Sequence, residues 1–350
     1  MELDLIKVHG SENSFFILDE TILERPLTEA ELVKVTTTLT NRETGLLNGA
    51  DGILFITKSS QPEAVAKMRV INSDGSEASM CGNGLRTVAR YLAEKEQLDY
   101  FHVETMHANL LVQKTTEIGH DVATYQVEIS PVSFQTSTLP LIGKGETLIN
   151  QPFKELDSKL LFSAVAVPNP HLISFVDHET MESPLLEEIA RFVNGENPYF
   201  IDGVNVSFVE VLGKDQIFVK TYERGVGFTN ACGTAMSASS LMYVLLKEGS
   251  FDQKIQVFNP GGMVQTIVHQ DNEDNYWMEL IGNATYLQKI TLSLSDAQKG
   301  DFSNSQLMIL NENDAYQEFI KEAQNVLKRT ENILKRLLNQ RVKPLHKKKY

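Results

Sequence analysis

Cysteine is scarce in this sequence, which holds only Cys81 and Cys232 in 350 residues. Two cysteines exclude the disulfide framework of small secreted domains. The first residues also lack the basic stretch followed by an apolar core that marks a signal peptide. We therefore expect a cytoplasmic protein in which both cysteines are free thiols.

Long apolar runs and an excess of positive charge are missing as well. No stretch approaches the roughly 20 apolar residues that span a bilayer. The net charge of −14 argues against nucleic acid as a partner of the main body. The sequence also has no P-loop, no G-x-G-x-x-G after a strand, and no CxxC or HExxH spacing, which argues against nucleotide and metal sites.

The two cysteines stand in matching contexts. Cys81 in "SMCGNGLRTVARYLAEKE" and Cys232 in "NACGTAMSASSLMYVLLKE" each precede a glycine and a predicted helix, over residues 83–96 and 234–247. Strand-like segments surround both helices. The pattern predicts an α+β fold of two pseudo-symmetric halves, each a mostly antiparallel sheet or barrel wrapped around one main helix.

A cysteine at a helix start faces unpaired backbone N–H groups and the positive end of the helix dipole, which favour its thiolate. The same groups can hold a carboxylate. If the halves face each other, one thiol could remove a proton from one side of a carbon while the other supplies a proton to the opposite side. A disulfide-forming redox pair stays open as a second interpretation.

The motifs "RVINSDGSEASMCGNGLRTVARYL" and "YERGVGFTNACGTAMSASS" resemble those of the cofactor-independent diaminopimelate epimerases. The segments "HGSENSF", "VPNPHLISFV" and "DGVNVSFV" match in the family's order, so the resemblance spans roughly residues 3–292. It implies an active site in the cleft between the halves and catalysis without a cofactor or metal. It also implies a division into residues 1–130 with a returning strand at about 285–300, residues 131–284, and an extra segment 301–350.

The resemblance implies roles for named residues. Cys81 and Cys232 would be the acid and base, with His171 as a supporting polar group. The substrate-binding positions would be Asn13, Asn72, Gly82, Asn83, Asn169, Asn205, Glu223, Arg224, Gly233 and Thr234. Four positions depart from the family's usual residues, namely Phe228 for glutamate, Ala235 and Glu12 for glycine, and Leu85 for a smaller residue.

The expected activity is interconversion of LL- and meso-2,6-diaminopimelate in lysine and peptidoglycan precursor synthesis. Racemisation of another amino acid, such as histidine or a proline derivative, remains an alternative on the same scaffold. So does a non-catalytic binding or redox-sensing protein. The expected partner is a small amino-acid substrate, with no nucleic acid and no membrane, and a homodimer is left open.

The C-terminal segment differs from the rest. Residues 321–350 contain ten Lys or Arg and two Glu, a local charge of +8. From about residue 304 the apolar side chains form one helical stripe of Tyr316, Ile320, Ala323, Leu327, Thr330, Leu334 and Leu337. We expect a helix packed on the body or on a partner subunit, followed by a solvated basic end, with a membrane or nucleic-acid contact as the alternative.

Overall fold

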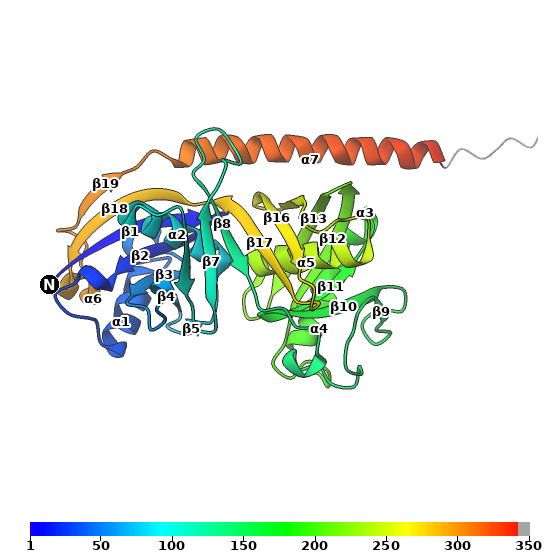
Figure 1. Cartoon of the computed structure of the whole chain (residues 1–350), viewed down its shortest axis with the longest axis horizontal. Helices are drawn as coiled ribbons and strands as arrows, with labels where there is room; N and C mark the ends of the chain where they lie inside the picture. The colour runs from blue at the N-terminus through cyan, green and yellow to red at the C-terminus, as the bar shows by residue number, and fades with distance from the viewer. Residues whose placement is uncertain (342–350) are drawn as a thin grey trace, which may run out of the picture.

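The computed structural model describes residues 1–341, with side chains through residue 330. It confirms an α+β fold in which strands dominate (Figure 1). The first half consists of β1 (Glu2–Gly10), β2 (Asn13–Asp19), β3 (Gly52–Thr57), β4 (Ala64–Asn72), β5 (Glu77–Ala78), α2 (Gly82–Glu96), β6 (Tyr100–Glu104), β7 (Asn109–Lys114) and β8 (Thr124–Ile129).

The second half repeats this order. Its elements are β10 (Leu161–Val167), β11 (Asn169–Phe175), β12 (Asn205–Gly213), β13 (Gln216–Glu223), β14 (Gly227–Thr229), α5 (Gly233–Leu246), β15 (Lys254–Asn259), β16 (Gly262–Gln270) and β17 (Tyr276–Asn283). The predicted helices at 83–96 and 234–247 are confirmed as α2 and α5 to within one residue at each end.

Strand pairing shows the duplication directly. In the first half β1–β2 is antiparallel, β2–β3 parallel, β3–β4 antiparallel, β4–β6 parallel, and β6–β7 and β7–β8 are antiparallel. The second half has the same series from β10–β11 to β16–β17. The two halves are therefore copies of one topology.

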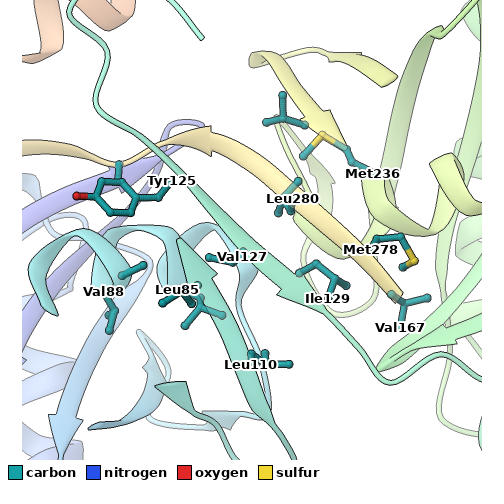
Figure 2. Packing of buried hydrophobic residues seen from close by; sticks show 14 of the residues in the cluster. Leu85, Val88, Leu110, Tyr125, Val127, Ile129, Val167, Met236, Met278 and Leu280 are labelled. Atoms are coloured by element: carbon teal, nitrogen blue, oxygen red, sulfur yellow. The ribbon is translucent and has the colours of Figure 1, made fainter. Parts of the chain in front are cut away.

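Strands β8 and β17 end the two series and pair with each other, antiparallel, from Met278–Ile129 to Asn283–Thr124. Leu280 of β17, Ile129 of β8 and Met236 of α5 share one buried apolar cluster (Figure 2). The two halves are thus joined by a hydrogen-bonded ladder and by a common core.

Further elements flank the duplicated ones. They are α1 (Glu29–Leu39), β9 (Gln151–Pro152), α3 (His178–Glu182), α4 (Leu185–Asn194), β18 (Thr285–Ser293), α6 (Leu294–Lys299), β19 (Gln306–Ile309), α7 (Asn313–Arg341), and the 3₁₀ turns Glu20–Ile22, Leu46–Asn48 and Thr136–Thr138. Strand β18 pairs with β1, so the chain returns to the first half after β17. The domain boundaries themselves stay a prediction.

The C-terminal segment departs from the expected start of its helix. Residues 306–309 form strand β19 beside β18, and α7 begins at Asn313. The expected packing on the body is confirmed, because Tyr316, Ile320 and Ala323 are buried against it. The side chains of Leu334 and Leu337 and the basic residues 342–350 lie outside the part that the structure describes. Within residues 1–341, no helix combines the length and the apolar character that crossing a membrane requires.

Candidate active site

The two cysteines begin the two helices that the duplication relates. Cys81 is the N-cap of α2 and Cys232 the N-cap of α5, and both are free thiols. A Cβ atom placed on Gly82 would lie 3.0 Å from Leu280 Cδ2, and one placed on Gly233 would lie 2.8 Å from the same atom. The glycines therefore allow both helix starts to approach one leucine at the junction of the halves.

Asn83 links the two helix starts. Its Nδ2 donates a hydrogen bond to the carbonyl of Ala231, beside Cys232, at 3.2 Å. Its Oδ1 is buried and has no hydrogen-bond partner among the described residues. Asn83 Oδ1 is thus an acceptor that the described residues leave unsatisfied.

Cys81 is half-buried and lies among polar groups. Its sulfur accepts a hydrogen bond from the Gly84 N–H at 3.4 Å, and its thiol lies 3.7 Å from Asn13 Oδ1. Asn13 Nδ2 in turn donates to Asp51 Oδ2 at 2.6 Å. Because the amide nitrogen faces Asp51, the amide oxygen faces Cys81.

Cys232 is buried beside a carboxylate. Its sulfur lies 3.5 Å from Thr234 Oγ1, and its thiol also hydrogen-bonds to the side chain of Glu223. Thr229 donates to Glu223 Oε1 at 2.6 Å. Burial raises the pKa of Glu223. The hydrogen bonds from Thr229 and Cys232 lower this pKa, but burial has the larger effect.

The structure corrects the expectation that the helix starts favour thiolates. Burial raises the pKa of Cys81 to about 11 and that of Cys232 well above the value of a free cysteine. The hydrogen bonds from the first turns act in the opposite direction but are weaker than the loss of hydration. Glu223 adds a repulsive charge to both thiols. With the site in this arrangement, both cysteines are neutral at pH 7.

A second group of predicted residues lies in the second half. His171 is fully buried, and its Nε2 is 3.0 Å from Asn169 Oδ1. Burial lowers the pKa of His171 to about 3, so the ring is neutral. Asn205 Oδ1 accepts the backbone N–H of Arg224 at 2.8 Å, while the exposed Arg224 guanidinium donates to the Asp202 carbonyl.

Asn72 is less closely connected. It ends β4, as Glu223 ends β13, but its side chain donates to Ser76 Oγ within its own turn at 3.1 Å. Asn13 and Asn169 likewise begin the equivalent strands β2 and β11. The predicted ligands therefore occupy duplicated positions, even where no hydrogen bond within the described chain links them to a thiol.

The departures from the family pattern have different surroundings. Phe228 is 48% exposed, with its ring 5.3 Å from that of Tyr222. Ala235 and Leu85 are fully buried inside the helices α5 and α2. Glu12 adopts a left-handed backbone, with φ +64°, which explains why glycine suits this position.

Sequence reasoning missed Asp51. It precedes β3, accepts Asn13 Nδ2 and the Ser14 N–H, and is paired with Arg42. An aspartate before a strand is common in loops, so no local signal distinguished this one. Only the parallel pairing of β2 with β3 brings it to Asn13.

Other parts of the molecule are weaker candidates for the active site. A cavity of about 520 Å³ in the first half is lined by residues that include Glu20, Arg69 and Met106, and by neither cysteine. We place the site at the helix starts because the nucleophilic groups lie there. Among the side chains of residues 1–330, no three or more His, Cys, Asp or Glu are grouped so that they could hold a metal ion.

Comparison with known proteins gives a consistent result. A family model described as diaminopimelate epimerase matches residues 5–132 and 163–287. The diaminopimelate epimerase of Enterococcus faecalis is 58% identical over 321 residues, covering 92% of this chain and 98% of that protein. The diaminopimelate epimerase of Lactiplantibacillus plantarum is 54% identical over 326 residues, covering 91% and 98%. The residues of this chain that lie outside these two alignments are fewer than the residues in segment 301–350. Part of that segment therefore has a counterpart in these relatives.

Solved structures share the fold at low sequence identity. A phenazine biosynthesis protein of the PhzF family from Bacillus anthracis superposes with a TM-score of 0.60 at 18% identity, covering 84% of this chain and 99% of that one. A hydroxyproline epimerase from Agrobacterium vitis gives 0.55 at 14% identity, covering 86% and 95%. These two likenesses support the fold alone.

Proposed function

The chain belongs to the diaminopimelate epimerase family, and we propose from this premise that it interconverts LL- and meso-2,6-diaminopimelate with two cysteines. The observation that carries the proposal is the meeting of two cysteine-capped helix starts over Leu280. A substrate carbon held there would have one thiol on each side. Inversion at a stereocentre requires this arrangement.

The chemistry needs one thiolate and one thiol. The thiolate removes the α-proton, the electron pair is delocalised into the substrate carboxylate, and the opposite thiol returns a proton to the other face. Backbone N–H groups at the starts of α2 and α5 stabilise the developing negative charge. The two thiols exchange roles when the reaction runs in reverse.

The two thiols are unequal before substrate binds. Cys81 is half-buried and lies near the positive charge of Arg86, whereas Cys232 is buried and bonded to Glu223. Cys81 is therefore easier to ionise. The substrate brings an ammonium group into the site, and its positive charge favours the thiolate. The unsatisfied Asn83 Oδ1 supplies an acceptor for such an N–H group.

This mechanism uses neither pyridoxal phosphate nor a metal ion, because the two thiols and the helix starts supply the base, the acid and the anion-binding groups. The product would serve lysine and peptidoglycan precursor synthesis. Two reduced thiols also suit a cytoplasmic location. The remaining predicted ligands, including Asn72, Asn205 and Arg224, would bind the substrate's amino and carboxylate groups.

The test is to incubate reduced protein with LL-diaminopimelate in D₂O and to follow α-proton exchange and stereochemistry. The wild type should exchange and invert. Cys81→Ala and Cys232→Ala should each lose inversion by about two to four orders of magnitude, since acid–base groups typically contribute 10²–10⁴-fold. Ser239→Ala is a matched control in α5, because its buried hydroxyl has no partner among the described residues.

Full inversion activity in either alanine variant would contradict the two-thiol mechanism. A panel of other L-amino acids, including histidine and proline derivatives, tests the substrate separately. Inversion of one of these, without inversion of diaminopimelate, would reassign the substrate but keep the mechanism.

A further inference from the structure

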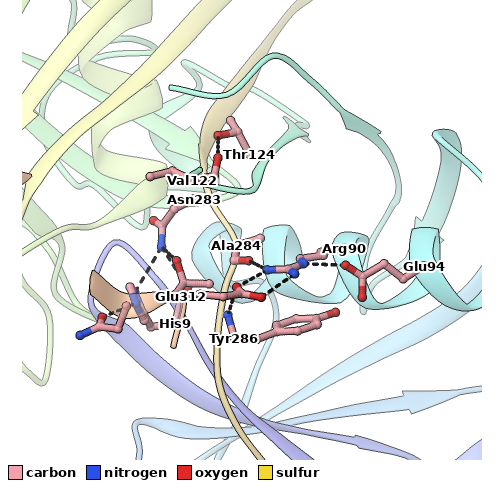
Figure 3. A network of polar contacts seen from close by, with 11 residues as sticks. His9, Arg90, Glu94, Val122, Thr124, Asn283, Ala284, Tyr286 and Glu312 are labelled. Carbon is pink, nitrogen blue, oxygen red and sulfur yellow. Dashed lines mark hydrogen bonds and ion pairs between the residues drawn. The ribbon is translucent and has the colours of Figure 1, made fainter. Parts of the chain in front are cut away.

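Helix α7 lies over both halves and has no part in the proposed chemistry (Figure 1). Its start is fixed to the first half. Glu312, directly before the helix, accepts hydrogen bonds from Arg90 of α2 at 2.6 and 2.8 Å and from the Tyr286 N–H at 3.0 Å (Figure 3). Asn313 Oδ1 lies 3.2 Å from His9 Nε2.

The next turns of α7 pack on the second half. Phe319, Ile320 and Ala323 form a buried apolar cluster with Leu212, Phe258 and Met263 of β12, β15 and β16. Gly262 leaves room for this contact, since a Cβ atom there would overlap Ile320. One helix therefore contacts both halves at fixed positions.

Between these anchors, Tyr316 reaches the loop that joins β1 to β2. Its side chain is 1% exposed, its ring packs edge-on against His9 with centroids 4.7 Å apart, and its hydroxyl is hydrogen-bonded to Ser11. Ser11 Oγ also accepts from Arg86 Nη2 at 2.9 Å, and the Ser11 N–H donates to Asn283 Oδ1 at 2.7 Å. Ser11 is thus held from three directions.

This loop has an unfavourable backbone. Ser11 and Glu12 are consecutive non-glycine residues in the left-handed region, with φ of +53° and +64°. The left-handed region is unfavourable for residues that carry a Cβ atom. Conformations of this kind persist where surrounding contacts determine them. Here the surrounding contacts include those of α7.

The contacts of the Glu12 side chain stabilise a left-handed backbone that glycine would adopt without strain. Gln317 of α7 donates to Glu12 Oε1 at 3.4 Å, and Asn230 donates to Glu12 Oε2 at 3.5 Å. Asn230 is two residues before Cys232. Glu12 therefore connects α7, the loop before Asn13 and the loop before the second thiol.

We propose that Tyr316 and Gln317 of α7 are positioning residues for the active site, which hold residues 10–13 so that Asn13 faces Cys81. The proposal rests on the function proposed above. It assigns a role to α7 within segment 301–350, to which the family resemblance gives no function, and accounts for the glutamate at position 12. The helix acts through the loop.

Point variants of the full-length enzyme test this role. Tyr316→Phe removes the hydroxyl and keeps the ring, and Gln317→Ala removes the bond to Glu12. Glu318→Ala is the matched control, because Glu318 is the exposed neighbour on the same helix. Loss of one hydrogen bond of about 1 kcal/mol predicts a roughly threefold to tenfold fall in kcat/KM for Tyr316→Phe. It also predicts faster amide hydrogen exchange in residues 11–13 and an unchanged rate in β11.

A double-mutant cycle adds a readout that a general loss of stability would not produce. In the Glu12→Gly background, Gln317→Ala should have no further effect, because the bond is already absent. If Tyr316→Phe and Gln317→Ala match Glu318→Ala in both kinetics and amide exchange, the positioning role is wrong. If the wild type does not act on diaminopimelate, the proposed function fails, and the amide exchange of residues 11–13 still decides the role of α7.

Discussion

The orientation of the Asn13 side-chain amide depends on a single neighbouring residue. Its position was predicted by resemblance, but its orientation is set by Asp51, which lies in another strand connection and carries no sequence signal. The same holds for the thiols. Their places at helix starts could be predicted, whereas their raised pKa values could not, because these depend on how deeply the two halves bury them.

Two substitutions of Asp51 separate its charge from its hydrogen bond. Asp51→Asn keeps an acceptor for Asn13 Nδ2 and removes the negative charge that raises the pKa of Cys81, whereas Asp51→Ala removes both. Both variants should shift the pH profile of Cys81 alkylation by iodoacetamide to lower pH. Only Asp51→Ala should also lower kcat/KM, by about tenfold.

The rate of alkylation at each cysteine can be followed by mass spectrometry of the intact peptides. Asp74→Asn, in an exposed turn of the same half, is the control. A profile for Asp51→Asn that coincides with the wild type would show that the charge does not act on Cys81.

Among the helices and strands, those with a local signal were predictable. The amphipathic spacing after Cys81 predicted α2, and Gly82, the first residue of the helix, marked its start. Helix α1 was missed, although Thr28 and Glu31 form a capping box at its start. The pattern from about residue 304 predicts a helix, but residues 306–309 pair with β18 and form a strand. Such pairing joins distant residues and has no local pattern.

Leu280 of β17 provides the test at this level. It is fully buried, and its Cδ2 atom fills the space beside Gly82 and Gly233 that a Cβ atom would otherwise occupy. Leu280→Ala should therefore lower the free energy of unfolding by about 2–5 kcal/mol. It should also reduce kcat, because both helix starts lose their common support. Leu292→Ala in β18, a buried leucine away from the thiols, should lose comparable stability in urea titrations.

Equal kcat values for folded Leu280→Ala and Leu292→Ala would mean that Leu280 contributes packing alone. A kcat reduced only in Leu280→Ala would support its place between the two helix starts.

For the whole molecule, the duplication was predictable from two matched motifs, but the junction was not. The antiparallel pairing of β8 with β17 and the course of α7 over both halves follow from contacts between segments far apart in sequence. The same packing buries two neutral histidines. Burial lowers the pKa of His9 to about 4 and that of His171 to about 3.

Stability should therefore fall in acid. An unfolded histidine has a pKa of about 6.5, so below this pH the unfolded state binds more protons than the folded state. Each buried histidine then lowers the free energy of unfolding by up to about 1.4 kcal/mol per pH unit as the pH falls from 6.5 towards 4. Urea unfolding at pH 7, 6 and 5 measures the slope. His9→Gln should reduce it and exposed His107→Gln should not; equal slopes for these two variants would exclude His9 as a source.

The pairing of β8 with β17 also bears on how such a protein could arise. The two strands are equivalent members of the repeated topology, and they meet antiparallel, so the contact is related by an approximate two-fold axis. A contact of that kind is self-complementary, which means that a single half could have made the same ladder with a second copy of itself. An ancestral homodimer of half-length chains would already have brought two identical cysteine-capped helix starts together at such a junction. Gene fusion would then have allowed the two copies to diverge, giving the different surroundings of Cys81 and Cys232.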